Sequence, residues 1–247
     1  MNRRVPLLCL SLILLGPTLS SAQATPTASP RTPISSKNWD KLEPGDIVFI
    51  RSRSANAPLI AALSNLEENS DADDVFTHCG IIFKDSEDKL RVYEGEGRGA
   101  GNYLTLAGWQ ERVSKGKVDN VEKSDLHNVY AMRWKGEPKL ATDLDSILAK
   151  AKELHDTPYD YGFSWTDTRA YCSELVWKAY SAGHLSLGTL PTMKKYVEGA
   201  PKSAQKIIDK LEEAKAAKCR EDGYLPDESA ISPEDIYQSP FLTPITH

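Results

Sequence analysis

A helix that begins at a cysteine is the sequence feature that most constrains this chain. After Cys172, apolar residues follow at helical spacing, which predicts a helix with one buried face that ends at Gly183. Cys172 lies on that face in the first turn, where the macrodipole and unpaired backbone N–H groups favour a thiolate over a thiol. The position therefore indicates either a cysteine nucleophile or a small core residue that opens an amphipathic helix.

The first 24 residues have the pattern of a signal peptide. Arg3 and Arg4 precede an apolar run at 7–15, and Ala22-Gln23-Ala24 fits an A-x-A cleavage site. The run is shorter than the ~20 apolar residues that cross a bilayer. Cys9 lies too early in it for a lipid-attachment site. We therefore predict export to a bacterial cell envelope, periplasmic or secreted, without a stable membrane anchor.

The rest of the chain is expected to form one domain. Residues 25–38 are rich in Thr, Ser, Pro and Ala and predict a flexible lead-in, which leaves residues 39–247 as the domain. Without Arg3 and Arg4, 28 of the 30 Lys and Arg remain against 35 Asp and Glu, a formal charge of −7. Nothing in this acidic balance suggests the clustered Lys and Arg that nucleic-acid binding needs.

Short strands come first along the domain and helices dominate its later part. Strands are predicted at 47–50, 76–83, 89–94 and 127–134, and helices at 57–68, 140–155 and 201–218. A turn at 85–88 predicts that the second and third strands pair. The glycines of residues 95–102 predict a mobile loop, and the segment lacks the residue order of a dinucleotide site. Residues 103–125 predict a loop or short helix, and 232–235 resemble a helix start.

Two candidate partners for Cys172 lie on neighbouring strands. A cysteine amidase needs a thiol at a helix N-terminus, a histidine base and a polar group that orients the histidine. His78 is on the second strand and Glu94 ends the third, so the three meet if this sheet packs against the helix. His78 as a hydrogen-bonded core residue is the alternative. The competing bases lack a polar partner on an adjacent strand: His127, His155 and His184.

The cysteine count leaves the redox state open. The mature chain keeps Cys79, Cys172 and Cys219, and an odd number in an oxidising compartment leaves at least one free thiol. Either Cys79 pairs with Cys219, or all three are free and Cys79 is buried. A zinc site at His78, Cys79 and Glu94 is disfavoured because adjacent strand residues point to opposite faces. We predict no metal and no cofactor.

Five segments together resemble a known family. They are residues 42–49, 77–82, 92–94, 159–160 with 171–176, and 232–240. In this order they resemble the permuted NlpC-type papain-like amidases, the YiiX/YaeF-like group, over most of the chain from about residue 40. The resemblance implies a circularly permuted papain-like α+β fold, in which an antiparallel sheet carrying the histidine packs against the helix with the nucleophilic cysteine. It also implies amide hydrolysis, typically in peptidoglycan-type peptides.

The resemblance assigns roles residue by residue. Cys172 is the nucleophile, His78 the base and Glu94 the orienting residue, with Glu96 as the alternative third residue. Cys79 departs from the apolar residue usual beside the histidine.

The predicted substrate-binding residues surround the cysteine in the sequence. Tyr159 is expected to line the pocket and Asp160 to meet a substrate amine, while Tyr171 and Ser173 flank Cys172. Ser173 with the following glutamate can instead cap the helix. Residues 184–225 are expected to form part of the wall of the active site.

The expected activity is that of an exported cysteine hydrolase which cleaves an amide bond in a small peptide or peptidoglycan fragment through an acyl-enzyme. Two alternatives remain from the sequence. The first is a lipid or ester hydrolase, or an acyltransferase, on the same fold. The second is a non-catalytic protein that binds an amino acid or peptide, for which a reactive Cys172 is unnecessary.

Overall fold

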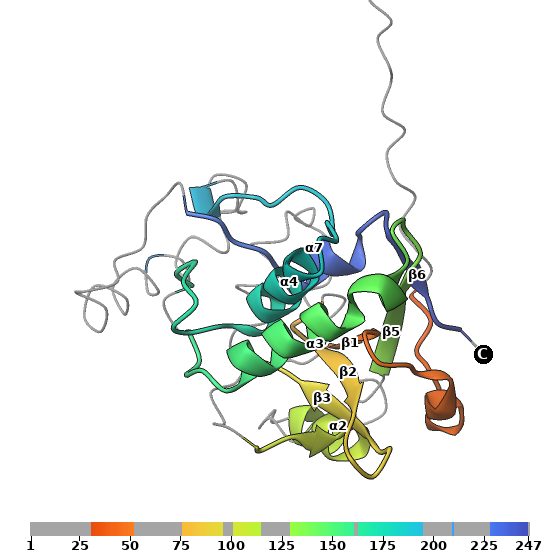
Figure 1. Ribbon diagram of the computed structural model, residues 1–247. Helices are drawn as coiled ribbons and strands as arrows, with labels where there is room; N and C mark the ends of the chain where they lie inside the picture. Colours follow the sequence, from red (N-terminus) through yellow and green to blue (C-terminus); the bar gives the residue numbers. More distant parts are fainter. Residues whose placement is uncertain are drawn as a thin grey trace, which may run out of the picture.

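The computed structural model describes residues 31–51, 76–95, 101–114, 129–160, 163–194, 209 and 228–246 (Figure 1). The predicted signal peptide and the predicted helix at 57–68 lie outside these residues, as does the predicted helix at 201–218 apart from residue 209.

A six-stranded sheet forms the centre of the described molecule, in the order β4-β3-β2-β1-β5-β6. The strands are β1 (Ile47–Ile50), β2 (His78–Lys84), β3 (Leu90–Tyr93), β4 (Leu104–Thr105), β5 (Val129–Trp134) and β6 (Leu242–Pro244). Every neighbouring pair is antiparallel. The predicted strands and the predicted hairpin are confirmed, with ends that differ by a residue or two. β1 lies inside the sheet and is buried on both faces, which explains its continuous apolar sequence.

Two helices cover one face of the sheet (Figure 1): α3 (Leu140–His155) and α4 (Cys172–Ala182). They pack against each other, and both contact β2. On α3, Ile147, Ala151 and Leu154 recur at helical spacing and are fully buried. On α4, Tyr180 is fully buried and its hydroxyl donates to Gly45 O at 2.7 Å, across to the turn before β1. Both helices begin and end close to their predicted bounds.

The opposite face of the sheet is covered by α2 (Leu106–Ser114) and by residues near η1 (Ser36–Lys41). Trp109 of α2 is fully buried against a second apolar cluster that includes Ile82 and Val92. Alternate residues of β2 therefore pack on opposite faces of the sheet: Ile81 on the α4 side and Ile82 on the α2 side. The sequence left residues 103–125 as a loop or short helix, and the structure places β4 and α2 at their start.

The flexible lead-in predicted for residues 25–38 is not what the structure shows from residue 31 onward. The Ile34 N–H donates to Val129 O at 2.7 Å, and the Ile34 side chain is 5% exposed. Arg31 forms an ion pair with Glu234 at 2.6 Å. An apolar side chain and a charged one thus attach this Pro- and Ser-rich segment to the domain.

The C-terminal segment returns to the same part of the molecule. α7 (Pro233–Tyr237) begins at the predicted site, where the Ser232 hydroxyl accepts from Asp235 N at 3.1 Å. β6 then pairs with β5 at the edge of the sheet. None of the helices in the described part of the chain combines the length and apolar character that a membrane crossing needs.

Candidate active site

Cys172 is the first residue of α4, as its sequence position predicted, and is 5% exposed. Just before it, the Tyr171 N–H donates to Glu174 Oε2 at 3.3 Å, so a side chain satisfies one backbone donor of the helix start. The helix dipole and the N–H groups of the first turn therefore act on the thiol of Cys172. The positive end of a helix lowers the pKa of a cysteine thiol, whereas burial raises it.

His78 and Glu94 lie side by side at the end of the β2–β3 pair. His78 begins β2, Glu94 directly follows β3, and the pairing of Ile81 with Tyr93 sets their register. His78 Nε2 is 2.7 Å from Glu94 Oε2, and the two side chains are 11% and 1% exposed. The expected pairing of histidine and carboxylate is therefore present in the structure.

Cys172 and His78 interact directly, and each shifts the pKa of the other. Burial disfavours a charge on His78, but the neighbouring Cys172 and Glu94 outweigh it and raise the pKa of His78 to about 10. The pKa of Cys172 lies well below its ordinary value, because a hydrogen bond from Cys79 and the positive charge of His78 outweigh burial. At neutral pH the pair is thus a thiolate beside an imidazolium.

Cys79 is a third sulfur-bearing participant in this cluster. It is a free thiol, fully buried, which is one of the two alternatives that the sequence left open; Cys219 lies outside the described residues. Burial and the negative charge of Cys172 raise the pKa of the Cys79 thiol. Cys79 therefore keeps its proton and donates it in a hydrogen bond to the sulfur of Cys172.

Trp109 is a functional neighbour that sequence reasoning missed. Its indole Nε1–H donates to Glu94 Oε2 at 2.6 Å, the same oxygen that His78 contacts. The rings of Trp109 and His78 lie 5.7 Å apart between centroids. A fully buried donor therefore fixes the carboxylate that in turn fixes the histidine. The spacing of Leu106 and Trp109 on a short helix was the only available signal, and it is weak.

His155 contacts the same carboxylate residue through the backbone. Its Nδ1 lies 2.9 Å from Glu94 O and 3.2 Å from Glu94 N, so its tautomer decides whether it donates or accepts. Considered from the sequence as a competing base, His155 is instead a buried residue of α3 that holds the main chain at Glu94. His184 is exposed after α4, and His127 and Glu96 lie outside the described residues.

Gly95 packs tightly against the start of α4, which its place in a glycine-rich loop did not predict. A Cβ on Gly95 would lie 2.6 Å from Tyr171 C and 2.9 Å from Cys172 N. Only a glycine lets the chain after β3 approach the start of α4 this closely. This contact fixes how close the N-terminus of α4 lies to Glu94, the residue before Gly95. Residues 96–100 lie outside the described part of the chain.

The four predicted substrate-binding residues occupy different environments. Tyr159 is half-buried and forms a bridge with Ala170. Asp160 is 2% exposed and accepts a hydrogen bond from Ser164 Oγ at 3.0 Å. The expectation that Asp160 meets a substrate amine stays a prediction, because the neighbouring residues 161–162 are outside the described residues.

Tyr171 and Ser173 both contact the C-terminal segment. Ser173 Oγ donates to Ile231 O at 2.7 Å, and Tyr171 Oη accepts from Ile231 N at 3.2 Å. Both side chains are nearly fully buried. The structure thus gives each a structural contact that ties residues 230–232 to the start of α4, and their substrate-binding role remains a prediction.

Comparisons with known proteins show the family to which this fold belongs. A family model described as the permuted papain-like amidase enzymes, YaeF/YiiX, C92 family, matches residues 41–246. The chain is 28% identical to the uncharacterized protein YiiX of Escherichia coli strain K12 over 204 residues, 81% of this chain and 84% of YiiX. It also resembles a crystal structure described as the metalloprotein YiiX from Escherichia coli O157:H7, at 26% identity and a TM-score of 0.59, over 83% of this chain and 96% of the other. The chain therefore belongs to the permuted papain-like amidases of the YaeF/YiiX family and is a cysteine hydrolase of amide bonds.

Proposed function

We propose that this protein is an exported amidase that cleaves an amide bond in a cell-wall peptide or aminoacyl substrate through Cys172, His78 and Glu94. The observation that carries the proposal is the hydrogen-bonded series from Cys172 through His78 to Glu94, at the N-terminus of a helix, in a chain of an amidase family. This arrangement supports Cys172 as nucleophile, His78 as base and Glu94 as orienting group in acyl transfer.

The reaction proceeds by acyl transfer. The Cys172 thiolate attacks the carbonyl carbon of the substrate, and the backbone N–H of Cys172 stabilises the developing oxyanion. The imidazolium of His78 then donates its proton to the leaving amine. In the second half, neutral His78 accepts a proton from water, which hydrolyses the thioester and restores the thiolate–imidazolium pair.

Glu94 serves this cycle by holding His78 in place. Its Oε2 accepts from both His78 and Trp109, and its carboxylate stabilises the positive charge that His78 carries before each acylation. The charge on His78 appears and disappears during the cycle while the carboxylate stays ionised.

A metal is not part of this mechanism. The described residues of this chain contain no group of three or more His, Cys, Asp or Glu side chains placed to hold an ion, although the YiiX crystal structure is described as that of a metalloprotein. His78 and Cys79 both approach Cys172, but each is already engaged with that sulfur through a hydrogen bond. The described residues around Cys172 therefore do not fit a metal site.

Reactivity of the thiol tests the catalytic pair without a known substrate. Iodoacetamide labelling of the mature protein, read site by site by mass spectrometry across pH, is expected to show fast labelling of Cys172 well below the ordinary thiol pKa of about 8.5. His78→Ala should abolish this low-pH labelling, with the fold checked by circular dichroism. Slow labelling of Cys172 at every pH in the wild type would favour a non-catalytic binding protein.

Substrate class and export need separate experiments. Cell fractionation with N-terminal sequencing of the released protein is expected to show a mature chain that begins at Thr25. Hydrolysis of purified peptidoglycan peptides should be lost in Cys172→Ala and His78→Ala. Turnover of lipid esters or lipid amides but not of these peptides would point instead to the lipid-hydrolysing alternative.

A further inference from the structure

We propose that Cys79 and Cys172 form a peroxide-sensitive dithiol, in which oxidation joins the two sulfurs in a disulfide that a thiol reductant reverses. In the amidase mechanism only Cys172 forms a bond to the substrate, and the second buried thiol beside it only donates a hydrogen bond to the Cys172 sulfur. The disulfide itself does not depend on the proposed function, whereas its effect on hydrolysis does.

The fold directs both sulfurs into one layer. Cys79 shares a face of β2 with Ile81 and Phe83, the face that α3 and α4 cover. Cys172 opens α4 in the same buried cluster. The close approach of Gly95 to the Cys172 N–H fixes the start of α4 over this end of the sheet. As a result, the two thiols are hydrogen-bonded to each other.

The two cysteines differ in the way that a reactive and a resolving thiol differ. Cys172 is 5% exposed and carries the thiolate, while Cys79 is fully buried and protonated. Because the thiolate is the nucleophile, Cys172 is the sulfur that peroxide is expected to oxidise first. Redox-active cysteines are commonly thiolates with such a second thiol alongside.

Oxidation proceeds in two balanced steps. The Cys172 thiolate attacks one oxygen of hydrogen peroxide, so an S–O bond forms and the O–O bond breaks. The hydroxide that leaves takes a proton from the His78 imidazolium and becomes water, and the sulfur is now a sulfenic acid. The Cys79 sulfur then attacks the Cys172 sulfur, forming the S–S bond and breaking the S–O bond, and the Cys79 proton leaves with the hydroxyl as a second water.

The first step prepares the second. Part of what holds the proton on Cys79 is the negative charge of Cys172. That charge disappears when Cys172 becomes a neutral sulfenic acid, so Cys79 ionises more readily at the stage where its sulfur must attack. Condensation then protects Cys172, because a sulfenic acid without a neighbouring thiol goes on to the irreversible sulfinic acid.

Peptide mapping tests the linkage directly. Reduced mature protein is treated with hydrogen peroxide, unreacted thiols are alkylated, and the digest is analysed without reduction. We expect the wild type to lose two thiols and yield one cross-linked pair of peptides, containing Cys79 and Cys172, which dithiothreitol releases. Cys219→Ser, the matched control at the remaining mature-chain cysteine, should give the same pair.

Removal of the resolving thiol gives the opposite result. Cys79→Ser and Cys79→Ala should both form sulfinic acid at Cys172 that dithiothreitol does not reverse. The two substitutions differ in polarity, so a folding defect in one, seen as a lowered melting temperature, leaves the other informative. Reversible single-thiol oxidation of the wild type, or a Cys172–Cys219 cross-link, overturns the proposal.

A parallel assay separates this proposal from the proposed function. If the Cys79–Cys172 cross-link forms and hydrolysis of peptidoglycan peptides is lost until reduction, both hold. A cross-link without loss of hydrolysis supports the dithiol and refutes Cys172 as the nucleophile. Active enzyme that forms no cross-link under peroxide refutes the dithiol and leaves the amidase intact.

Discussion

Glu94→Gln removes a charge beside His78 while keeping the two hydrogen bonds to Oε2. His78 and Trp109 both contact the same carboxylate oxygen, Oε2. A glutamine whose amide oxygen takes that position still accepts from both donors, and its NH2 group replaces Oε1. The substitution therefore isolates what the negative charge contributes to the protonated state of His78.

The size of the effect follows from the contact. A hydrogen bond to a charged group contributes ~1.5–3 kcal/mol and a neutral one ~0.5–1.5 kcal/mol, a difference of about 1–1.5 kcal/mol. A unit charge ~4 Å away at an effective dielectric constant of ~20 contributes about 4 kcal/mol as an upper bound. Since about 1.4 kcal/mol corresponds to one pH unit, the pKa of His78 should fall by about one to three pH units. The wild-type pKa from which it falls is about 10.

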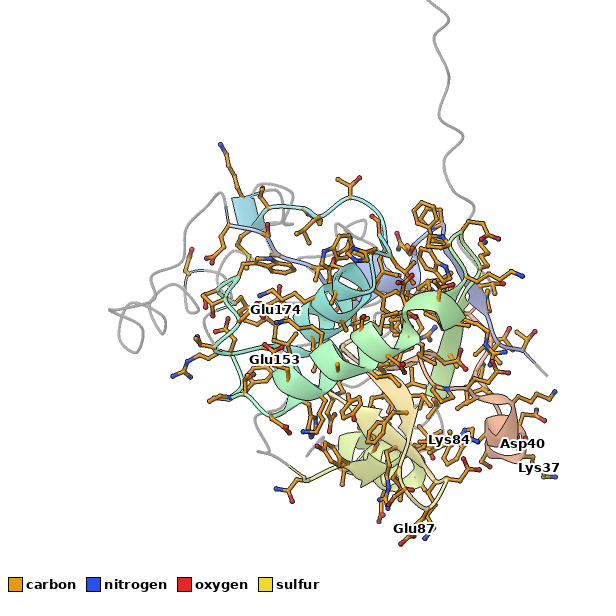
Figure 2. All side chains as sticks on the ribbon, in the orientation of Figure 1. Lys37, Asp40, Lys84, Glu87, Glu153 and Glu174 are labelled. Carbon is orange, nitrogen blue, oxygen red and sulfur yellow. The ribbon has the colours of Figure 1, made fainter. Side chains whose placement is uncertain are left out.

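Histidine-selective NMR measures this pKa directly. The His78 signal is assigned by its absence in His78→Gln, and its shift is followed with pH in the wild type and in Glu94→Gln. Glu87→Gln is the control, because Glu87 is an exposed acid in the turn between β2 and β3, at the far end of β2 from His78 (Figure 2). An unchanged pKa in Glu94→Gln would refute the idea that Glu94 stabilises the imidazolium.

Three further substitutions test contacts around the site. Trp109→Phe removes the buried donor to Glu94 Oε2, so the free energy of unfolding measured with urea should fall by about 2 kcal/mol. Tyr180→Phe leaves Gly45 O without its hydroxyl donor and should cost about 1–3 kcal/mol in the same assay, with Cys172 labelling unchanged. Burial raises the pKa of Glu174 from 4.5 to about 8, so the folded state keeps a proton that the unfolded state has lost. Stability from this group therefore falls as pH rises through that window. Glu174→Gln should flatten the fall in melting temperature between pH 5 and pH 8, and an unchanged fall would contradict this reasoning.

The elements that carry the site were predictable because each depends on a local pattern. The period of α4 placed Cys172 at a helix start, and the hairpin turn after β2 placed His78 and Glu94 on paired strands. Trp109 was not predictable in this way. It reaches Glu94 from the opposite layer of the sheet, and its position depends on how a nine-residue helix packs there.

Strand alternation predicted that His78 and Cys79 point to opposite faces of the sheet, but it did not predict that both would interact with Cys172. Cys79 faces the layer of α4, as alternation requires, and the His78 ring approaches Trp109 of the other layer. Both nevertheless interact with Cys172. Because His78 is the first residue of β2, its side chain lies at the end of the sheet, where it interacts with Cys172 at the start of α4. Alternation separates side chains across the middle of a sheet and fails as an argument at its end.

The chain order of the site also follows from this geometry. Histidine and glutamate precede the cysteine by many residues, yet the site requires only that β2 pairs with β3 and that α4 packs on β2. Neither contact depends on which element comes first. The described ends of the chain meet elsewhere, where Arg31 pairs with Glu234 and Ile34 bonds to β5. A permuted chain can therefore keep the site, provided that the segments at its two ends still pack against the rest of the domain. The packing of residues 31–34 is the contact that meets this requirement here, so a chain that begins after Ile34 should lose stability while its Cys172 labelling profile stays that of the full-length mature protein.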